Sequence, residues 1–350
     1  MSRSQDPQRP FFPFGNPFRM ILPKSSSLSP RLVAILNSFE ETLAERLKTL
    51  KPKDCKEIQS LSWMISALNS LFAIHTDVKS LITSLELPVS NWDDKWIDVY
   101  LDNSVKLLDV CIAFSSEISR LNQGHLFLHC SLHNLDCATA EQFLKARSSL
   151  DGWKQHVSSK NPRLEKCFSI LDNLVDTLDL PKIKNSSKGK VLMCAMYGVR
   201  VITVFICRVL AAAFSCSAVK LSDLKVRETC LWSEAFTDLQ ACVHGQVRNA
   251  LSSGKVAVMK ELDLVDATVT KLYPLIQITD DAEAMRSSIT ELRESADILS
   301  QGLHLLSKEV DGFFQIVLTG RDALLGNLRV GSDLSNSTRK NNHPEWSTVR

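Results

Sequence analysis

Proline is scarce in the body of the chain, and this scarcity limits the folds that the chain can adopt. Six of the twelve prolines lie within the first thirty residues, and only five lie between Arg31 and His343, namely Pro52, Pro88, Pro162, Pro181 and Pro274. A proline inside a helix breaks it, so this spacing favours long helices separated by these prolines. Runs of alternating β-branched residues between turn signals are also nearly absent. We therefore predict an all-α fold: an elongated multi-helix bundle of long antiparallel amphipathic helices around an apolar central helix, with disordered N- and C-terminal tails.

Charge, cysteine spacing and sequence motifs give no support to several functional classes. Lys and Arg number 41 against 39 Asp and Glu, and the net charge of +2 gives no overall attraction for nucleic acid. The ten cysteines show no CxxC spacing and no apolar signal run begins the chain, which favours reduced thiols in an intracellular protein. No phosphate-binding glycine loop, serine-centred elbow or dinucleotide fingerprint is present. We therefore predict a protein that is not an enzyme and has no cofactor, metal or small-molecule substrate.

The stretch 191–214 is apolar on every side and is long enough for a core helix or a membrane span. Its eleven Val, Leu, Ile and Phe residues favour insertion into a bilayer by roughly 3–7 kcal/mol, whereas Arg200 and Arg208 oppose insertion by up to about 5–7 kcal/mol. Hydropathy therefore does not decide between the two. We favour the centre of a soluble bundle, in which each arginine reaches a carboxylate at the rim or solvent. The alternative is a single-pass membrane-anchored regulator linked to secretory traffic.

Composition divides the chain into three parts. Residues 1–29 are rich in Pro, Phe and Arg and are predicted to be a disordered tail, residues 30–325 form the helical bundle domain, and residues 326–350 form a disordered polar tail. Within the bundle, residues 178–190 combine a proline, a glycine, two serines and four lysines. This segment is the best candidate boundary between two halves, 30–180 and 187–325.

The N-terminal tail contains the segment FFPFGNPFRM at positions 11–20, and its four phenylalanines are the candidate partner-binding residues: Phe11, Phe12, Phe14 and Phe18. Exposed phenylalanine is unfavourable in water, so we expect docking on the body of the protein itself, with a protein partner or a membrane surface as alternatives. The scarcity of acidic residues before Glu40 is also typical of a plastid transit peptide. We predict a location in the cytoplasm or on the cytosolic face of endomembranes, with a single-pass membrane location and the plastid as alternatives.

Three histidines follow a predicted helix over residues 90–124, which begins at the N-cap Ser90 and for which Gly124 is a plausible end. His125, His129 and His133 are spaced four apart, and helical spacing would place two imidazoles where they could chelate zinc. The segment has no HExxH pattern, and Gly124 argues against a continuous helix. We favour histidines that bind no metal, and a metal-dependent enzyme is the alternative.

The clearest periodic element is an a/d seam of about five heptads over residues 282–317. Its members are Ala282, Met285, Ile289, Leu292, Ala296, Leu299, Leu303, Leu306, Val310, Phe313 and Val317. We expect this seam to pack within the bundle, and a coiled coil with another chain is the alternative. Gly302 and Gly312 lie outside the seam and weaken a free-standing helix, which favours internal packing.

Several long segments resemble the BYPASS family of plant proteins. They are FFPFGNPFRM (11–20), LPVSNWDDKW (87–96), VYLDNSVKLLDVCIAFSSEISRLNQG (99–124), NSSKGKVLMCAMYGV (185–199) and LWSEAFTDLQ (231–240). The resemblance spans the chain from the tail to the late body, and it brings no catalytic or cofactor residues. It implies a developmental regulator that restrains a root-derived mobile signal which arrests shoot growth. Proteins of the wider group are associated with exocyst subunits, so the resemblance also implies protein partners of that kind.

Overall fold

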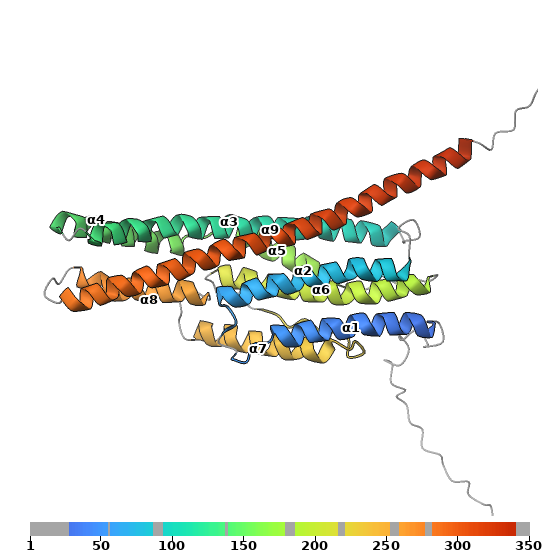
Figure 1. Ribbon diagram of the computed structural model, residues 1–350, viewed down its shortest axis with the longest axis horizontal. Helices are drawn as coiled ribbons and strands as arrows, with labels where there is room; N and C mark the ends of the chain where they lie inside the picture. The colour runs from blue at the N-terminus through green and yellow to red at the C-terminus, as the bar shows by residue number, and fades with distance from the viewer. Residues whose placement is uncertain are drawn as a thin grey trace, which may run out of the picture.

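The computed structural model describes residues 28–54, 57–86, 94–136, 139–178, 186–215, 221–252, 259–276 and 282–340, and within these ranges the regular structure is helical throughout. Figure 1 shows an elongated bundle whose helices run close to its long axis. The helices are α1 (Pro30–Leu50), α2 (Leu61–Leu85), α3 (Asp94–Asp136), α4 (Ala140–Ser158), α5 (Pro162–Asp176), α6 (Ser187–Phe214), α7 (Ser233–Ser252), α8 (Lys260–Leu275) and α9 (Ala282–Lys340). The predicted fold class is confirmed.

Serine and asparagine side chains cap the start of several of these helices. The side chains of Ser29, Asn161 and Ser186 each accept a hydrogen bond from a backbone N–H in the first turn of α1, α5 and α6. Pro30 and Pro162 occupy the first helical position, where the missing N–H costs no hydrogen bond. Local sequence therefore fixes where these three helices start.

Helix α6 forms the centre of the bundle. Every residue from Val201 to Phe214 is buried, and α1, α2, α3 and α5 all pack against this helix. Within the described ranges, α6 is the one helix that is long and apolar enough to cross a membrane, and most of its apolar window is enclosed by the protein itself. Because α6 is buried on all sides, the protein's own helices remove its apolar surface from water, and no lipid is needed for this.

The two arginines of α6 reach the edge of the bundle in different ways. The guanidinium of Arg208 donates to Ser222 Oγ at 2.8 Å and lies 3.4 Å from the exposed carboxylate of Asp172, as predicted. The guanidinium of Arg200 instead donates to the backbone carbonyl of Thr177, the residue that caps the C-terminus of α5. A helix C-terminus carries partial negative charge, so it replaces the carboxylate that the sequence led us to expect.

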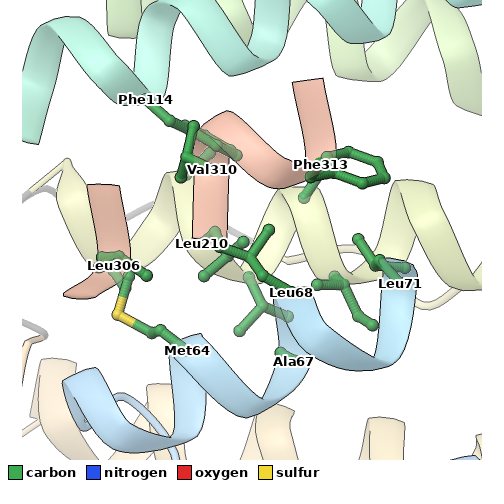
Figure 2. Packing of buried hydrophobic residues seen from close by; sticks show 14 of the residues in the cluster. Met64, Ala67, Leu68, Leu71, Phe114, Leu210, Leu306, Val310 and Phe313 are labelled. Atoms are coloured by element: carbon green, nitrogen blue, oxygen red, sulfur yellow. The ribbon is translucent and has the colours of Figure 1, made fainter. Parts of the chain in front are cut away.

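The seam of α9 packs inside the bundle against α2, α3 and α8. All of its members from Leu292 to Val317 are buried, and Met285 and Ile289 are partly buried against the same core. Figure 2 shows Leu306, Val310 and Phe313 of α9 beside Met64, Leu68 and Leu71 of α2. The expectation of internal packing is confirmed for this helix.

Two helices extend beyond the C-terminal ends that the sequence predicts for them. Helix α3 runs through Gly124 to Asp136. Gly124 faces α4, and a Cβ atom at this position would lie 3.0 Å from Trp153 and from His156. This glycine permits close helix packing and does not end the helix. Helix α9 continues past Gly326 to Lys340, so the helix extends into the predicted polar tail. No proline interrupts the chain between Leu275 and Lys340.

The cysteines correct one prediction made from composition. Six described cysteines carry free thiols, and Cys111, Cys167 and Cys207 among them are buried as small apolar residues. Cys242, however, is joined in a disulfide, whose partner lies outside the described ranges. The prediction of ten reduced thiols is therefore wrong at this position, because spacing along the chain does not reveal which cysteines the fold brings together.

Candidate functional site

The predicted partner-binding residues Phe11, Phe12, Phe14 and Phe18 lie outside the described residues. The remaining candidates are the histidines of α3 and the cavities between helices.

The predicted histidine stripe lies on one continuous helix, but it does not form a metal centre in the part of the chain that the structure describes. The rings of His125 and His129 contact each other edge to face, with centroids 6.0 Å apart. Burial, followed by the nearby His129, lowers the pKa of His125. No group of three His, Cys, Asp or Glu side chains within the described ranges could hold a metal ion.

The structure contains an apolar cavity that the sequence analysis did not anticipate. It lies where the end of α2, the start of α3, the first half of α6 and the later part of α9 meet, toward the end of the bundle from which α9 diverges in Figure 1. It consists of a larger chamber of about 370 Å³ and a smaller chamber of about 50 Å³. Both chambers are lined by His75, Trp96, Tyr100, Met196 and Val199.

The histidine in this wall is held neutral. His75 Nε2 lies 3.1 Å from Thr203 Oγ1 of α6, and the ring contacts Phe313 edge to face with centroids 5.4 Å apart. Burial, aided by the positive charge of Lys79, lowers the pKa of His75 from 6.5 to about 4. At neutral pH the imidazole is therefore an uncharged group, and its hydrogen bond to Thr203 links α2 to α6.

Asn103 lines the smaller chamber, and its side-chain amide forms no hydrogen bond with any other group in the described part of the chain. Its side chain is 7% exposed, and neither its amide nitrogen nor its amide oxygen has a hydrogen-bond partner. The adjacent Ser104 is satisfied by contrast, because its hydroxyl donates to the carbonyl of Leu101 and accepts from Arg321 at 3.0 Å. Buried amides are almost always bonded, so the unpaired side chain of Asn103 is an unusual feature of this wall.

The aromatic wall of the cavity is set by packing between α3 and α9. Trp96 and Tyr100 stack one turn apart on α3, with ring centroids 5.7 Å apart. Position 320 must be small, because a Cβ atom there would lie 2.9 Å from Tyr100 Oη. Gly320 therefore lets α9 approach the tyrosine while the space beside both residues stays open.

The charges around the cavity are sparse and positive. Lys79 lines the larger chamber and is exposed, and Arg200 lines the smaller one but already donates to the carbonyl of Thr177. No Asp or Glu lines either chamber among the described residues. The cavity thus has mostly apolar walls, with two cationic side chains at its edges and no acidic one.

Two sequence signals could have drawn attention to this region. His75 directly follows the apolar run 71–74 of α2, and Asn103 occupies a buried position of α3 where an apolar residue would be ordinary. Neither signal is specific without the structure, because each residue type is also common at hydrogen-bonded core positions.

Comparison with known proteins gives a consistent set of plant relatives. The family described as "Protein ROH1-like" matches residues 22–151. The chain is 52% identical over 329 residues to "Protein BPS1, chloroplastic" of Arabidopsis thaliana, covering 94% of this chain and 93% of the relative.

More distant matches agree with this result. "UPF0496 protein 4" of Oryza sativa subsp. indica is 43% identical over 87% of this chain and 69% of its own length. "Protein ROH1D" of Arabidopsis thaliana is 26% identical over 32% of this chain and 30% of its own length. No solved structure matches the chain.

Proposed function

Because the chain belongs to the BYPASS family of plant proteins, to which BPS1 of Arabidopsis thaliana gives its name, we propose that it is a plant developmental regulator that acts by binding other proteins and not by catalysis. The observation that carries this proposal is the similarity to BPS1, which extends along nearly the whole of both chains. The enclosed apolar helix α6 supports the role of a self-contained helical module, because its apolar surface is used for internal packing.

The protein partners are proposed to bind at the N-terminal tail and on the exposed helix faces. The tail contributes Phe11, Phe12, Phe14 and Phe18, and exposed leucines such as Leu126 on α3 and Leu144 on α4 offer further apolar contacts. Subunits of the exocyst are the partners that the family resemblance suggests.

Proximity labelling from the full chain in plant cells tests this proposal. The wild-type chain should label a reproducible set of proteins that includes exocyst subunits, and replacement of the four tail phenylalanines by serine should reduce this labelling. A matched variant with Ser25, Ser26 and Ser27 replaced by alanine, in the same tail, should label as the wild type does. Equal labelling by the phenylalanine variant would contradict a partner site in the tail.

The developmental role is proposed to be the restraint of a root-derived signal that arrests shoot growth. Grafting tests it in Arabidopsis plants that lack BPS1: roots that express this chain should support a growing wild-type shoot, whereas roots without it should not. Arrested shoots above roots in which the chain accumulates would contradict this role.

The similarity to a protein named chloroplastic supports the plastid among the locations considered. The N-terminal segment that would carry a transit peptide lies outside the described residues. A fluorescent tag at the C-terminus of the full chain distinguishes the locations. Colocalisation with chlorophyll would support the plastid and would exclude exocyst subunits as direct partners, whereas a cytosolic or endomembrane signal would support the other locations.

A further inference from the structure

We propose that the two chambers between α2, α3, α6 and α9 form one binding site for an apolar small molecule that ends in a neutral hydroxyl or carbonyl group. Binding at this site is independent of the developmental role proposed above, because it depends on the cavity alone.

The larger chamber fits the apolar body of such a molecule. Its volume of about 370 Å³ lies within the range of roughly 300–1,000 Å³ that is common for small-molecule sites. Its walls are mostly aliphatic and aromatic side chains from four helices, among them Ile82, Met196, Val199 and Ile316. An apolar ligand would gain affinity by leaving water for these walls.

The smaller chamber fits the polar end. A volume of about 50 Å³ leaves room for little more than one small group. Asn103 lines this chamber, and its amide is buried and unpaired, so a small rotation of the side chain would present it to a bound group. An amide both donates and accepts, so a hydroxyl or a carbonyl can satisfy it. The unpaired group in this wall, the amide of Asn103, is itself uncharged, and a charge buried without an ionic partner is strongly unfavourable. The proposal therefore takes the polar end to be neutral, beside an Arg200 side chain that donates to Thr177.

The two chambers share Trp96, Tyr100, Met196, Val199 and His75 in their walls and are therefore adjacent. The proposal places one molecule across both chambers, past these shared side chains. His75 stays uncharged at neutral pH because burial lowers its pKa to about 4. The shared wall is thus apolar or neutral along the path of the ligand.

The test uses the purified full chain and prodan, a neutral naphthalene with one ketone whose emission shifts to the blue in apolar surroundings. The companion probe is the same dimethylaminonaphthalene without the acyl group. The wild-type chain should bind prodan saturably with one-to-one stoichiometry, and it should bind the companion probe more weakly because the companion lacks the bond to Asn103.

Two pairs of variants locate the site. Gly320→Leu should fill the larger chamber and weaken prodan binding by at least about tenfold, whereas Gly312→Leu on the same helix meets open space and should bind as the wild type does. Asn103→Leu should weaken binding of prodan by roughly fivefold to tenfold and leave the companion probe unaffected. Ser131→Ala removes another unpaired buried group from α3, outside the cavity, and should change neither affinity.

Asn103→Leu also keeps the test decisive if Gly320→Leu fails to fold, because removing an unsatisfied buried amide does not destabilise the helix. The proposal is overturned if the wild-type chain shows no saturable binding of prodan. It is also overturned if Gly320→Leu and Gly312→Leu bind equally, or if Asn103→Leu weakens both probes alike. If prodan binds only after the four tail phenylalanines are replaced by serine, then the chain's own N-terminal tail occupies the cavity. This result would also overturn the proposal.

Discussion

Gly302 of α9 lies directly against Leu61 at the start of α2. A Cβ atom at position 302 would lie 2.5 Å from Leu61 Cδ1 and 3.1 Å from Leu61 Cβ. The backbone N–H of Leu61 also donates to both carboxylate oxygens of Glu261 of α8 at 3.0 Å. Three helices distant in sequence therefore meet at this point, and the glycine that seemed to weaken α9 permits the contact.

Gly302→Ala should lower the free energy of unfolding by about 1–3 kcal/mol, because the added methyl group overpacks a site where Leu61 is buried. Gly245→Ala on α7 is the matched control, since its Cβ atom would meet nothing within 4 Å. This control should raise the free energy of unfolding by up to about 1 kcal/mol through helix propensity. Urea denaturation measures both, and equal effects would argue against close packing at position 302.

Arg120→Met should destabilise the junction of α3, α4 and α5. Glu117 is 1% exposed, and its carboxylate accepts from Arg120 Nε at 2.9 Å and from Asn161 Nδ2 at 2.9 Å. Removing the arginine leaves a buried carboxylate without its cation, which costs about 3–5 kcal/mol. Chemical denaturation at pH 7 measures this loss.

The double variant Glu117→Leu with Arg120→Met provides the control for that prediction. It removes both charges, so it should recover a large part of the stability lost in Arg120→Met alone. If the double variant is less stable than Arg120→Met alone, the ion pair is not the source of the loss.

The pKa of His75 predicts how stability depends on pH. Burial lowers this pKa from 6.5 to about 4 in the folded state, so between these values the unfolded chain binds the proton that the folded chain excludes. The free energy of unfolding therefore falls as the pH decreases, and the contribution of His75 between pH 7 and pH 5 is about 2 kcal/mol.

The variant His75→Gln lacks this titrating group, so it should not lose this stability when the pH is lowered from 7 to 5. The free energy of unfolding of the variant minus that of the wild type should therefore increase by the same amount over this range. Burial raises the pKa of Glu40, Glu261 and Asp266 and gives pH effects of opposite sign. These effects cancel in the comparison of the two proteins. A difference between them that is constant with pH would contradict a lowered pKa of His75 in the folded state.

Much of the fold could be predicted from the sequence because its signals are local. Proline spacing and caps such as Ser29 and Asn161 mark helix starts, and the apolar period of residues 282–317 identifies the buried face of α9. The uniform apolarity of residues 191–214 likewise indicated a helix with no water-facing side, but it did not decide between the core of a bundle and a membrane span.

The remaining features depend on contacts between distant segments, which local sequence does not encode. Gly124 looks like a helix end in sequence, but Trp153 of α4 packs against it. The larger chamber is lined by both Gly320 and Tyr100, which lie on two helices and are more than 200 residues apart in the chain. The side chain of Asn103 can be recognised as unpaired only from the structure, which shows that no neighbouring group forms a hydrogen bond with its amide.

The central claim is that α6 is enclosed by the protein's own helices, and labelling from within the membrane tests it most directly. A photoactivatable carbene reagent that partitions into lipid can be activated in membranes from plant cells that contain the full chain, and peptides from residues 187–214 can then be analysed by mass spectrometry. We predict that these peptides carry no label, because α1, α2, α3 and α5 cover the helix. Label on the side chains of residues 201–214 would show that the helix faces lipid and would contradict the account.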